Sequence, residues 1–366
     1  MALTEVAPPD TGAGQRAQAR RRPGRRWWPW RSYLARRVGK SAITLYLVVS
    51  LSFFLIRFMP GNPADAYIAQ LMSSQGLSYA DAANQARSVL AFDPDAPLVQ
   101  QYLQYLGGLA RGDLGESITS PGTTVVSQLT TFVPWTLFSV GLGLLLSFAL
   151  GVAAGVLVAY RRGGLLDHVV TNVSSFLHAV PNYVWAMLIL VVFGVQFGWF
   201  DVTAVRGTHS AGVEPGFTPE FIGDIFFHAG LPILVYVLTS FGGWFLTMKS
   251  STVQVLDEDF VTVARARGLT GARIGVHYVG RNAVLPLFAQ LAVSVGFVVG
   301  GSTLIERIFQ YNGVGYHLFD ALTKRDYPML QGFILVLTFS VIVANLLADV
   351  LLSRIDPRIS AGQEGR

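Results

Sequence analysis

The chain of 366 residues contains no cysteine and few charged residues. The lack of cysteine excludes disulfide bonds, thiolate metal sites and a cysteine nucleophile. Charged residues make up 13% of the chain and hydrophobic residues 52%, whereas a soluble domain carries about 25% charged residues. This deficit indicates a membrane protein. The net charge of +5 therefore favours contact with an anionic membrane surface rather than with nucleic acid.

The sequence also offers no catalytic constellation. The six histidines are scattered, and no Ser/His/Asp set or metal cluster has usable spacing. Gly39-Lys40-Ser41 matches the end of a P-loop, but that motif needs a glycine where Leu34 stands. We therefore expect no catalytic residue, no metal and no bound cofactor in this chain, and a membrane-bound enzyme is disfavoured.

Six apolar runs are long enough to cross the hydrocarbon as helices, which requires roughly 20 residues each. They are Ser41–Met59, Pro134–Tyr160, Val169–Phe197, Ala229–Met248, Ala283–Ile305 and Met329–Leu352. Their length and uniform apolar character exclude barrel strands. The sequence thus predicts an all-α polytopic membrane protein with six transmembrane helices.

Lysine and arginine lie mostly on one side of these predicted spans. The segment before the first span, the second and fourth loops and the C-terminal segment hold most of the 27. Because such residues concentrate in cytoplasmic loops, we expect both termini in the cytoplasm. Residues 1–30 form a basic tail with little apolar content, which predicts disorder. The long basic region and the lack of a small-residue cleavage pattern indicate that the first run is a retained span.

Small residues recur every four positions in two of the spans, so that another helix backbone can approach closely. They are Gly143, Ser147, Gly151, Gly155 and Ala159 in the second span and Ala292, Gly296 and Gly300 in the fifth. Helix packing is the favoured interpretation, and lining of a pore is the alternative. His178 is the titratable residue expected well inside a span, and we interpret it as a hydrogen-bonded packing residue. A proton relay is therefore disfavoured.

The loop after the first span is long, from about residue 60 to residue 133. Three stretches within it have helical spacing, over residues 65–76, 77–92 and 98–110. A loop of this length is usually functional. Docking of an external partner and a structural cap are both open interpretations.

The loop between the fourth and fifth spans is basic. Three acidic residues, 257–259, favour the start of a helix, Gly268 interrupts it, and Thr270 is a possible cap for a second helix. On that second helix Arg273, His277 and Arg281 fall every four residues as a basic stripe. An apolar stripe is predicted beside it, formed by Ala272, Val276, Val279 and Ala283. Composition alone leaves two interpretations open, an interfacial helix on anionic lipid and a docking element for a cytoplasmic protein.

The stretch "VARARGLTGARIGVHYVGRNAVLP" resembles the cytoplasmic loop of permease subunits in binding-protein-dependent ABC importers. The pattern "TARAKGL…HxxRNAxLP" is typical of the oligopeptide/dipeptide/nickel family, and of its "B"-type subunit. The resemblance implies that this loop couples the chain to an ATPase, and that a side chain at Gly268 would hold the two surfaces apart. The residues so assigned are Ala264, Arg265, Ala266, Arg267, Gly268, Leu269, Arg273, His277, Arg281, Asn282 and Pro286.

Further motifs extend the resemblance over roughly residues 31–360. They are "YLARRV", "FMPGNPA", "GGLARGDLGESI", "RDYPMLQG" and "NLLADVLLSRIDPRI". The third contains an external motif characteristic of the family, formed by Arg111, Gly112, Asp113, Leu114 and Gly115. One departure is Asn312-Gly313, where the family often has Pro-Gly.

The resemblance implies a type I ABC importer permease fold in a bacterial plasma (inner) membrane. It divides the chain into the basic tail 1–30, the interfacial segment, first span and external loop 31–133, the core permease domain 134–360 with its coupling loop 257–283, and the tail 361–366. It further implies one half of a translocation path. The implied partners are a second homologous permease subunit, two cytoplasmic ABC ATPases that use ATP and Mg²⁺, an extracytoplasmic substrate-binding protein and membrane lipids.

Di- or oligopeptides are the substrates that the resemblance implies. Nickel, glutathione, an opine or an oligosaccharide are alternatives within the same class. A channel or an ATP-independent secondary carrier is the alternative from a different class.

Overall fold

A computed structural model describes residues 29–58, 63–90 and 96–355 of the chain. Within these ranges the regular elements are helices, and the one β feature is an isolated antiparallel bridge between Glu116 and Thr124. The predicted all-α class is therefore confirmed for the described part of the chain. The predicted disorder of the basic tail and the predicted C-terminal tail, 361–366, fall outside the described residues, except that the first helix already includes residues 29 and 30.

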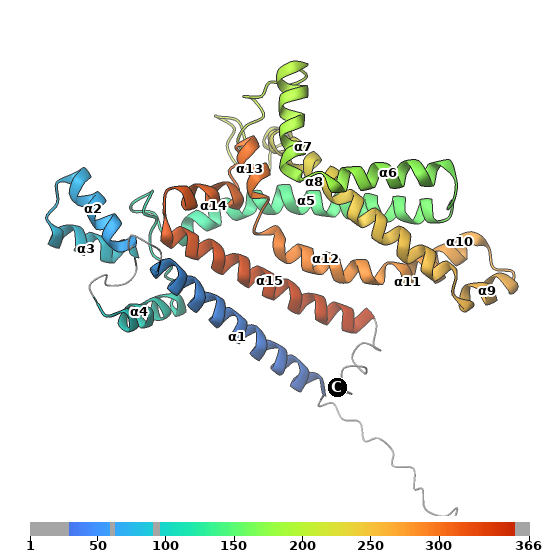
Figure 1. Ribbon diagram of the computed structural model, residues 1–366, viewed down its shortest axis with the longest axis horizontal. Coiled ribbons are helices and arrows are strands. Elements are labelled where there is room, and N and C mark those ends of the chain that lie inside the picture. The colour runs from blue at the N-terminus through green and yellow to red at the C-terminus, as the bar shows by residue number, and fades with distance from the viewer. Residues whose placement is uncertain (1–28, 59–62, 91–95, 356–366) are drawn as a thin grey trace, which may run out of the picture.

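The described residues include four long helices that each hold a candidate membrane span (Figure 1). They are α1 (Pro29–Arg57), α5 (Val125–Ala159), α8 (Pro219–Leu256) and α15 (Tyr327–Ile355). Each contains a stretch that is long and apolar enough to cross a membrane. They correspond to the first, second, fourth and sixth predicted spans, and each helix begins before its apolar run because flanking polar residues are also helical.

The third predicted span, 169–197, is bent rather than straight. α6 (Leu165–Ala179) is followed by α7 (Asn182–Leu188) and the π-helix η1 (Ile189–Gln196), which together lie at 96° to α6. Pro181 causes the break, because a proline disfavours helical backbone in the residue before it. Val180 is accordingly extended, with φ of −81° and ψ of 128°.

The fifth predicted span, 283–305, is interrupted as well. The elements in this part of the chain are α10 (Gly271–Arg273), the π-helix η2 (Ile274–Gly280), α11 (Arg281–Ala283), α12 (Leu285–Val298) and α13 (Thr303–Phe309). The stretch from α10 to α11 is bent by 47° from α12. Gly301, with φ of +69°, separates α12 from α13. The described residues therefore contain four straight candidate spans, or up to six when each bent pair counts as one.

The long loop after α1 contains the three predicted short helices. They are α2 (Pro63–Gln75), α3 (Tyr79–Leu90) and α4 (Leu98–Ala110). Buried side chains of α2 and α3 form one apolar cluster with α5, α14 (Val314–Thr323) and α15. Tyr67, Ala86, Leu129 and Met329 belong to it. This packing supports the structural-cap interpretation of the loop, and docking of a partner there stays a prediction.

The opposite end of the molecule carries α9 (Asp259–Ala266) and α10, which lie far from α2 and α3 in Figure 1. Between the two ends α5 packs on α8, α6 packs on α8, and α12 packs on α15. An apolar cluster of Leu144, Trp244, Met248, Ala283 and Leu287 joins α5, α8, α11 and α12. The loop between α8 and α12 is thus attached directly to the helices that it connects.

Candidate functional site

The loop between α8 and α12 holds the predicted coupling residues and folds into a helical unit. α9 begins at Asp259, directly after Asp257 and Glu258, so three carboxylates lie near the positive end of its dipole. α9 ends at Ala266, and Gly268 then adopts a left-handed backbone conformation with φ of +76°. The predicted helix start and the predicted break at Gly268 are both confirmed.

The backbone of this chain favours glycine at position 268, because its φ is positive. The Gly268 N–H donates to the Arg265 carbonyl at 2.9 Å, and the Leu269 N–H donates to the Ala264 carbonyl at 3.3 Å. Such bonds satisfy the carbonyls at a helix C-terminus. A Cβ at Gly268 would meet no atom within 4 Å. The constraint seen within the chain is therefore conformational, and close approach of a partner is a separate prediction.

The segment after this break is the π-helix η2, which changes the faces expected from the sequence. Ile274 and Val279 lie five positions apart and are both buried, because the i→i+5 hydrogen bonds of a π-helix widen the turn and bring these two positions nearer to one face than an α-helix would. The prediction of a continuous apolar stripe is therefore wrong for the first two of its four residues. Ala272 and Val276 are exposed, whereas Val279 and Ala283 are buried.

An apolar cluster holds this unit against the end of α8. Leu256 of α8 packs with Ala264 of α9 and with Ile274 and Val279 of η2, and Leu269 packs partly against them. Among the predicted coupling residues, Ala264 is buried and Leu269 is half-buried. These two side chains therefore support the unit and do not form its outer face.

The other predicted coupling residues are exposed, and we call them the connector surface. They are Arg265, Ala266, Arg267, Gly268, Arg273, His277, Arg281, Asn282 and Pro286. Asn282 donates from Nδ2 to the Tyr278 carbonyl at 2.6 Å. Four guanidinium groups make the connector surface strongly basic, which suits an acidic protein surface or anionic lipid.

An ion pair that the sequence analysis missed joins α6 to α8 near this unit. Lys249 Nζ donates to Asp167 Oδ1, and it donates to Thr171 Oγ1 at 2.8 Å. The side chains of Lys249 and Asp167 are only 21% and 11% exposed. A mostly buried pair fixes its two helices to each other, because loss of one charge leaves the other uncompensated. Since 82 positions separate the two residues, the sequence gives no local signal of the pair.

The small residues predicted on the second span face α8. A Cβ added at Gly143 would lie 3.0 Å from Tyr236 Cβ, and one at Gly151 would lie 2.5 Å from Trp244 Cβ. A Cβ at Gly155 would lie 2.9 Å from the carbonyl oxygen of Phe245, and Ser147 between them is buried. This placement allows α5 and α8 to pack with their backbones close together.

The small residues predicted on the fifth span face α15. A Cβ added at Gly296 would lie 2.9 Å from Val341 Cα, and one at Gly300 would clash with the Leu337 side chain. Ala292, one turn earlier, is half-buried. The glycines of both sets therefore lie at helix–helix contacts within this chain. Lining of a pathway by any of them stays a prediction.

The predicted external motif forms a tight turn after α4. Gly112 and Gly115 have φ of +79° and +78°, and the Gly115 N–H donates to Asp113 Oδ1 at 2.9 Å. Arg111 donates from Nε to the Gly107 carbonyl at 3.0 Å. Leu114 packs against the apolar cluster formed by α2, α3, α5 and α15. The motif thus sets the path of the chain from α4 into α5.

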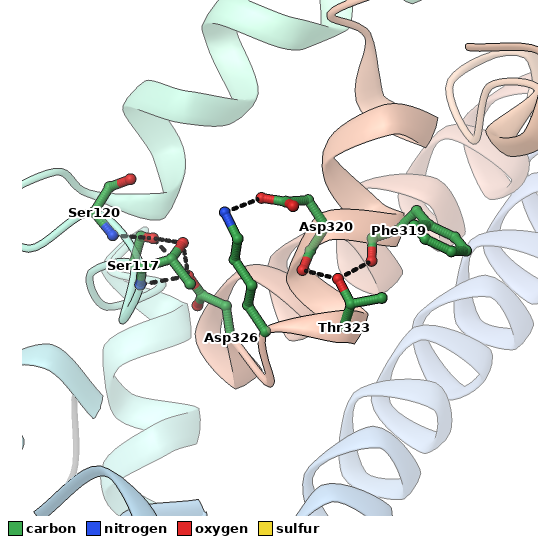
Figure 2. A network of polar contacts seen from close by, with 8 residues as sticks. Ser117, Ser120, Phe319, Asp320, Thr323 and Asp326 are labelled. Carbon is green, nitrogen blue, oxygen red and sulfur yellow. Dashed lines mark hydrogen bonds and ion pairs between the residues drawn. The ribbon is translucent and has the colours of Figure 1, made fainter. Parts of the chain in front are cut away.

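This turn continues into a polar network with the start of α15, which Figure 2 shows. Asp326 is fully buried, and its Oδ2 accepts hydrogen bonds from Ser117 Oγ at 2.5 Å and from the Thr119 N–H at 3.0 Å. Its Oδ1 accepts from the Met329 N–H at 3.2 Å. The network brings together two motifs that lie far apart in the sequence. Asp326 belongs to the quoted stretch "RDYPMLQG", but its role cannot be inferred from that stretch alone.

A second buried acid was also missed. Glu306 lies one position beyond the predicted fifth span and is only 1% exposed. Burial raises its pKa to about 7, although hydrogen bonds from the Tyr316 N–H and from Thr136 oppose this shift. His178, by contrast, is bound through Nδ1 to the Thr239 carbonyl at 3.1 Å. That bond supports the hydrogen-bonded part of the interpretation, but His178 is exposed on α6 rather than buried in the packing.

Comparison with known proteins places the chain among transport components. Residues 151–361 match the family described as "Binding-protein-dependent transport system inner membrane component". The chain is 34% identical over 340 residues to the Di/tripeptide transport system permease protein DppB of Pseudomonas aeruginosa, with 90% of this chain and 98% of that protein covered.

Two further relatives give the same result. The Oligopeptide transport system permease protein AppB of Bacillus subtilis is 30% identical over 328 residues, which cover 90% of this chain and 99% of that protein. The Dipeptide transport system permease protein DppB of Escherichia coli is 30% identical over 347 residues, which cover 89% of this chain and 98% of that protein. Together with the apolar helices, these matches confirm the resemblance found in the sequence. The chain belongs to the inner membrane components of binding-protein-dependent transport systems.

Proposed function

We propose that this chain is one of the two permease subunits of an ATP-driven importer of di- or oligopeptides. The named relatives are permease proteins of di/tripeptide, dipeptide and oligopeptide transport systems, and each of them is covered over nearly its whole length. Nickel, glutathione and oligosaccharides are the alternative substrates within this class. The small-residue contacts and the apolar helices suit a pathway built from helices of two such subunits.

The observation that carries the proposal is the connector surface. It is basic, exposed and held by an apolar cluster on the end of α8, and Ala283 and Leu287 attach its other end to α5 and α8. A force applied to this unit therefore reaches α8 and α12 without first deforming a loose loop. This is the property that a coupling element needs for a rigid-body switch between two arrangements of the helices.

The partners follow from this assignment. One of two ABC ATPases, which use ATP and Mg²⁺, docks on the connector surface from the cytoplasm, and the other docks on the second permease subunit. The excess of lysine and arginine on this side also favours a cytoplasmic position for both termini. A second permease subunit completes the pathway, and an extracytoplasmic binding protein delivers the peptide at the end that carries α2–α4. The chain itself binds no nucleotide and is not an enzyme in this scheme.

Reconstitution of the complete transporter in proteoliposomes tests the proposal. We expect uptake of radiolabelled trialanine that requires the binding protein and ATP. Ala266→Trp places a large side chain on the connector surface and should lower that uptake by about tenfold, because forcing extra bulk into a packed contact costs 1–3 kcal/mol. The matched control is Ala204→Trp, at an exposed position between η1 and α8, which should transport normally.

Each alternative predicts a different result in the same assay. Uptake that continues with inactivated ATPases would indicate a carrier or channel. Competition by nickel, glutathione or maltotriose, without competition by peptides, would replace the proposed substrate. Normal uptake by Ala266→Trp would contradict docking at the connector surface.

A further inference from the structure

Glu306, on α13, links two other segments of the chain, α5 and the start of α14. Its Oε2 accepts from the Tyr316 N–H at 3.0 Å, and its Oε1 accepts from Thr136 Oγ1 at 3.1 Å. Thr136 Oγ1 in turn accepts from the Val314 N–H at 2.8 Å. One buried carboxyl group thus links α13, which carries it, to the start of α14 and to α5.

These bonds complete the N-terminus of α14. The first N–H groups of a helix have no acceptor within the helix, and Gly313, at the N-cap position, has no side chain to supply one. Thr136 and Glu306 supply the acceptors from two other helices. Loss of the carboxyl group would therefore leave buried N–H groups unpaired, which is costly.

The backbone around Glu306 is shaped to its carboxyl group. A Cβ added at Gly301 would lie 2.7 Å from Oε1, and Cβ atoms added at Gly313 and Gly315 would lie 2.5 Å and 3.1 Å from Oε2. The neighbouring Arg307 directs its guanidinium to the ring of Tyr316, at 4.9 Å from the ring centroid. No ion pair of Glu306 occurs within the described residues. The carboxyl group is thus held by N–H and O–H donors rather than by a cation.

The third and fifth predicted spans, which are both bent, contact each other close to Glu306. Gly301 lies in the break between α12 and α13, and Asn182 follows the break between α6 and α7. Asn182 Nδ2 donates to Ser302 Oγ at 3.3 Å, and Ile305 packs in one apolar cluster with Ala186 of α7. Movement of α12 relative to α13 would therefore act at the contact that Glu306 stabilises.

We infer that Glu306 is a positioning residue for transport, which holds the α13–α14 segment on α5 while α12 moves beyond the Gly300–Gly301 break. This inference rests on the proposed transport function. Hinges of this kind lie at element ends and absorb backbone changes while the flanking segments stay packed. Without the carboxyl group, α13 and α14 are no longer fixed to α5 and move together with α12. A movement that starts at the connector surface then no longer changes the arrangement of α12 relative to α13.

Hydrogen–deuterium exchange and transport, measured on the complete complex, test the inference together. In Glu306→Ala, peptides covering residues 310–320 should exchange faster than in the wild type. The maximal rate of trialanine uptake per assembled complex should fall by about tenfold, which lies within the range for residues that couple two sites. The trialanine concentration at half-maximal rate should not change. Stimulation of ATP hydrolysis by the binding protein should be lost.

Two variants separate positioning from a general loss of folding. Glu306→Gln keeps an oxygen for the Tyr316 N–H and places a donor toward Thr136, so it should restore both exchange protection and transport. Glu220→Ala removes an exposed acid from the first turn of α8 and should change neither measurement.

Other results would overturn the inference. Exchange that is unchanged in Glu306→Ala would show that the carboxyl group does not fix the segment. Faster exchange with normal uptake would show that the fixation has no part in transport. If the wild-type complex does not import trialanine, the proposed substrate is wrong. The inference is then decided by exchange and by ATP hydrolysis stimulated by the binding protein.

Discussion

Ser117 and Asp326 lie 209 positions apart, and a hydrogen bond of 2.5 Å joins Ser117 Oγ to Asp326 Oδ2. Because Asp326 is fully buried, its removal would leave Ser117, the Thr119 N–H and the Met329 N–H without this acceptor. We predict that Asp326→Ala lowers the free energy of unfolding by about 3 kcal/mol. Asp326→Asn, which keeps one acceptor oxygen, should cost less. Thermal unfolding followed by tryptophan fluorescence in detergent measures both.

The matched control for this network is the ion pair of Asp320, a residue labelled in Figure 2. Lys324 Nζ pairs with Asp320 at 2.8 Å, but the lysine side chain is 55% exposed. Exposed ion pairs contribute about 1 kcal/mol or less, so Lys324→Ala should change stability little. If Asp326→Ala were as mild as Lys324→Ala, the buried network would not fasten the turn to α15.

Two glycines of α5 predict opposite effects of the same substitution. A Cβ at Gly151 would lie 2.5 Å from Trp244 Cβ, whereas a Cβ at Gly141 would lie 3.7 Å from Val298 Cγ1. Gly151→Ala should therefore force α5 away from α8 and destabilise the protein by about 2 kcal/mol. Gly141→Ala should be neutral or stabilising by up to about 1 kcal/mol, since alanine restricts the unfolded chain.

Thermal unfolding of the two purified variants in one detergent gives the comparison. Equal shifts in Tm would mean that α5 and α8 are not in close backbone contact. Because both positions are glycines on the same helix, the difference between the variants does not depend on helix propensity.

Position 268 offers a test of backbone conformation that is independent of any partner. Its φ of +76° strains a residue with a Cβ by roughly 1–2 kcal/mol, although asparagine tolerates this region better than alanine does. Gly268→Ala should therefore loosen the unit, seen as faster hydrogen exchange over residues 264–280, and Gly268→Asn should do so less. Indistinguishable exchange in the two variants would contradict a left-handed conformation at this position.

The pKa of Glu306 predicts how stability depends on pH. Burial raises it from the usual 4.5 to about 7, so the folded state favours the neutral carboxyl group. The associated stability is fully present below pH 4.5 and is lost as pH rises through about 7. We expect the Tm of the wild type to fall between about pH 5 and pH 8 by more than that of Glu306→Gln, whose amide does not titrate. Parallel curves would contradict the raised pKa, because other titrating groups are common to both proteins.

Composition and apolar run length predicted the all-α membrane class, and helical spacing predicted the three helices of the long loop. The predicted six spans agree with the structure only when each bent pair counts as one span. These features depend on the solvent that each stretch requires, which a single sequence records locally. The bends could be located only in part. Pro181 and Gly301 are visible in the sequence, but apolar composition on both sides suggested one continuous helix.

The exposed faces of the loop after α8 and the two buried acids could not be predicted, because they depend on residues far apart in the sequence. The π-helix from Ile274 to Gly280 shifts Val276 outward, and a repeat of 3.6 residues cannot anticipate that shift. Glu306 and Asp326 lie next to apolar runs and look like exposed helix ends. Both are in fact buried, and part of their hydrogen bonding comes from Thr136 and Ser117, which lie far away in the sequence.

The central claim is that the connector surface meets a separate ATPase, and site-specific photo-crosslinking tests it most directly. A benzophenone amino acid at position 266, in the assembled transporter, should form a crosslinked product that contains the ATPase subunit. The same probe at position 204 should not. A probe at position 266 that crosslinks only to lipid, or only to proteins on the opposite side of the membrane, would contradict the account.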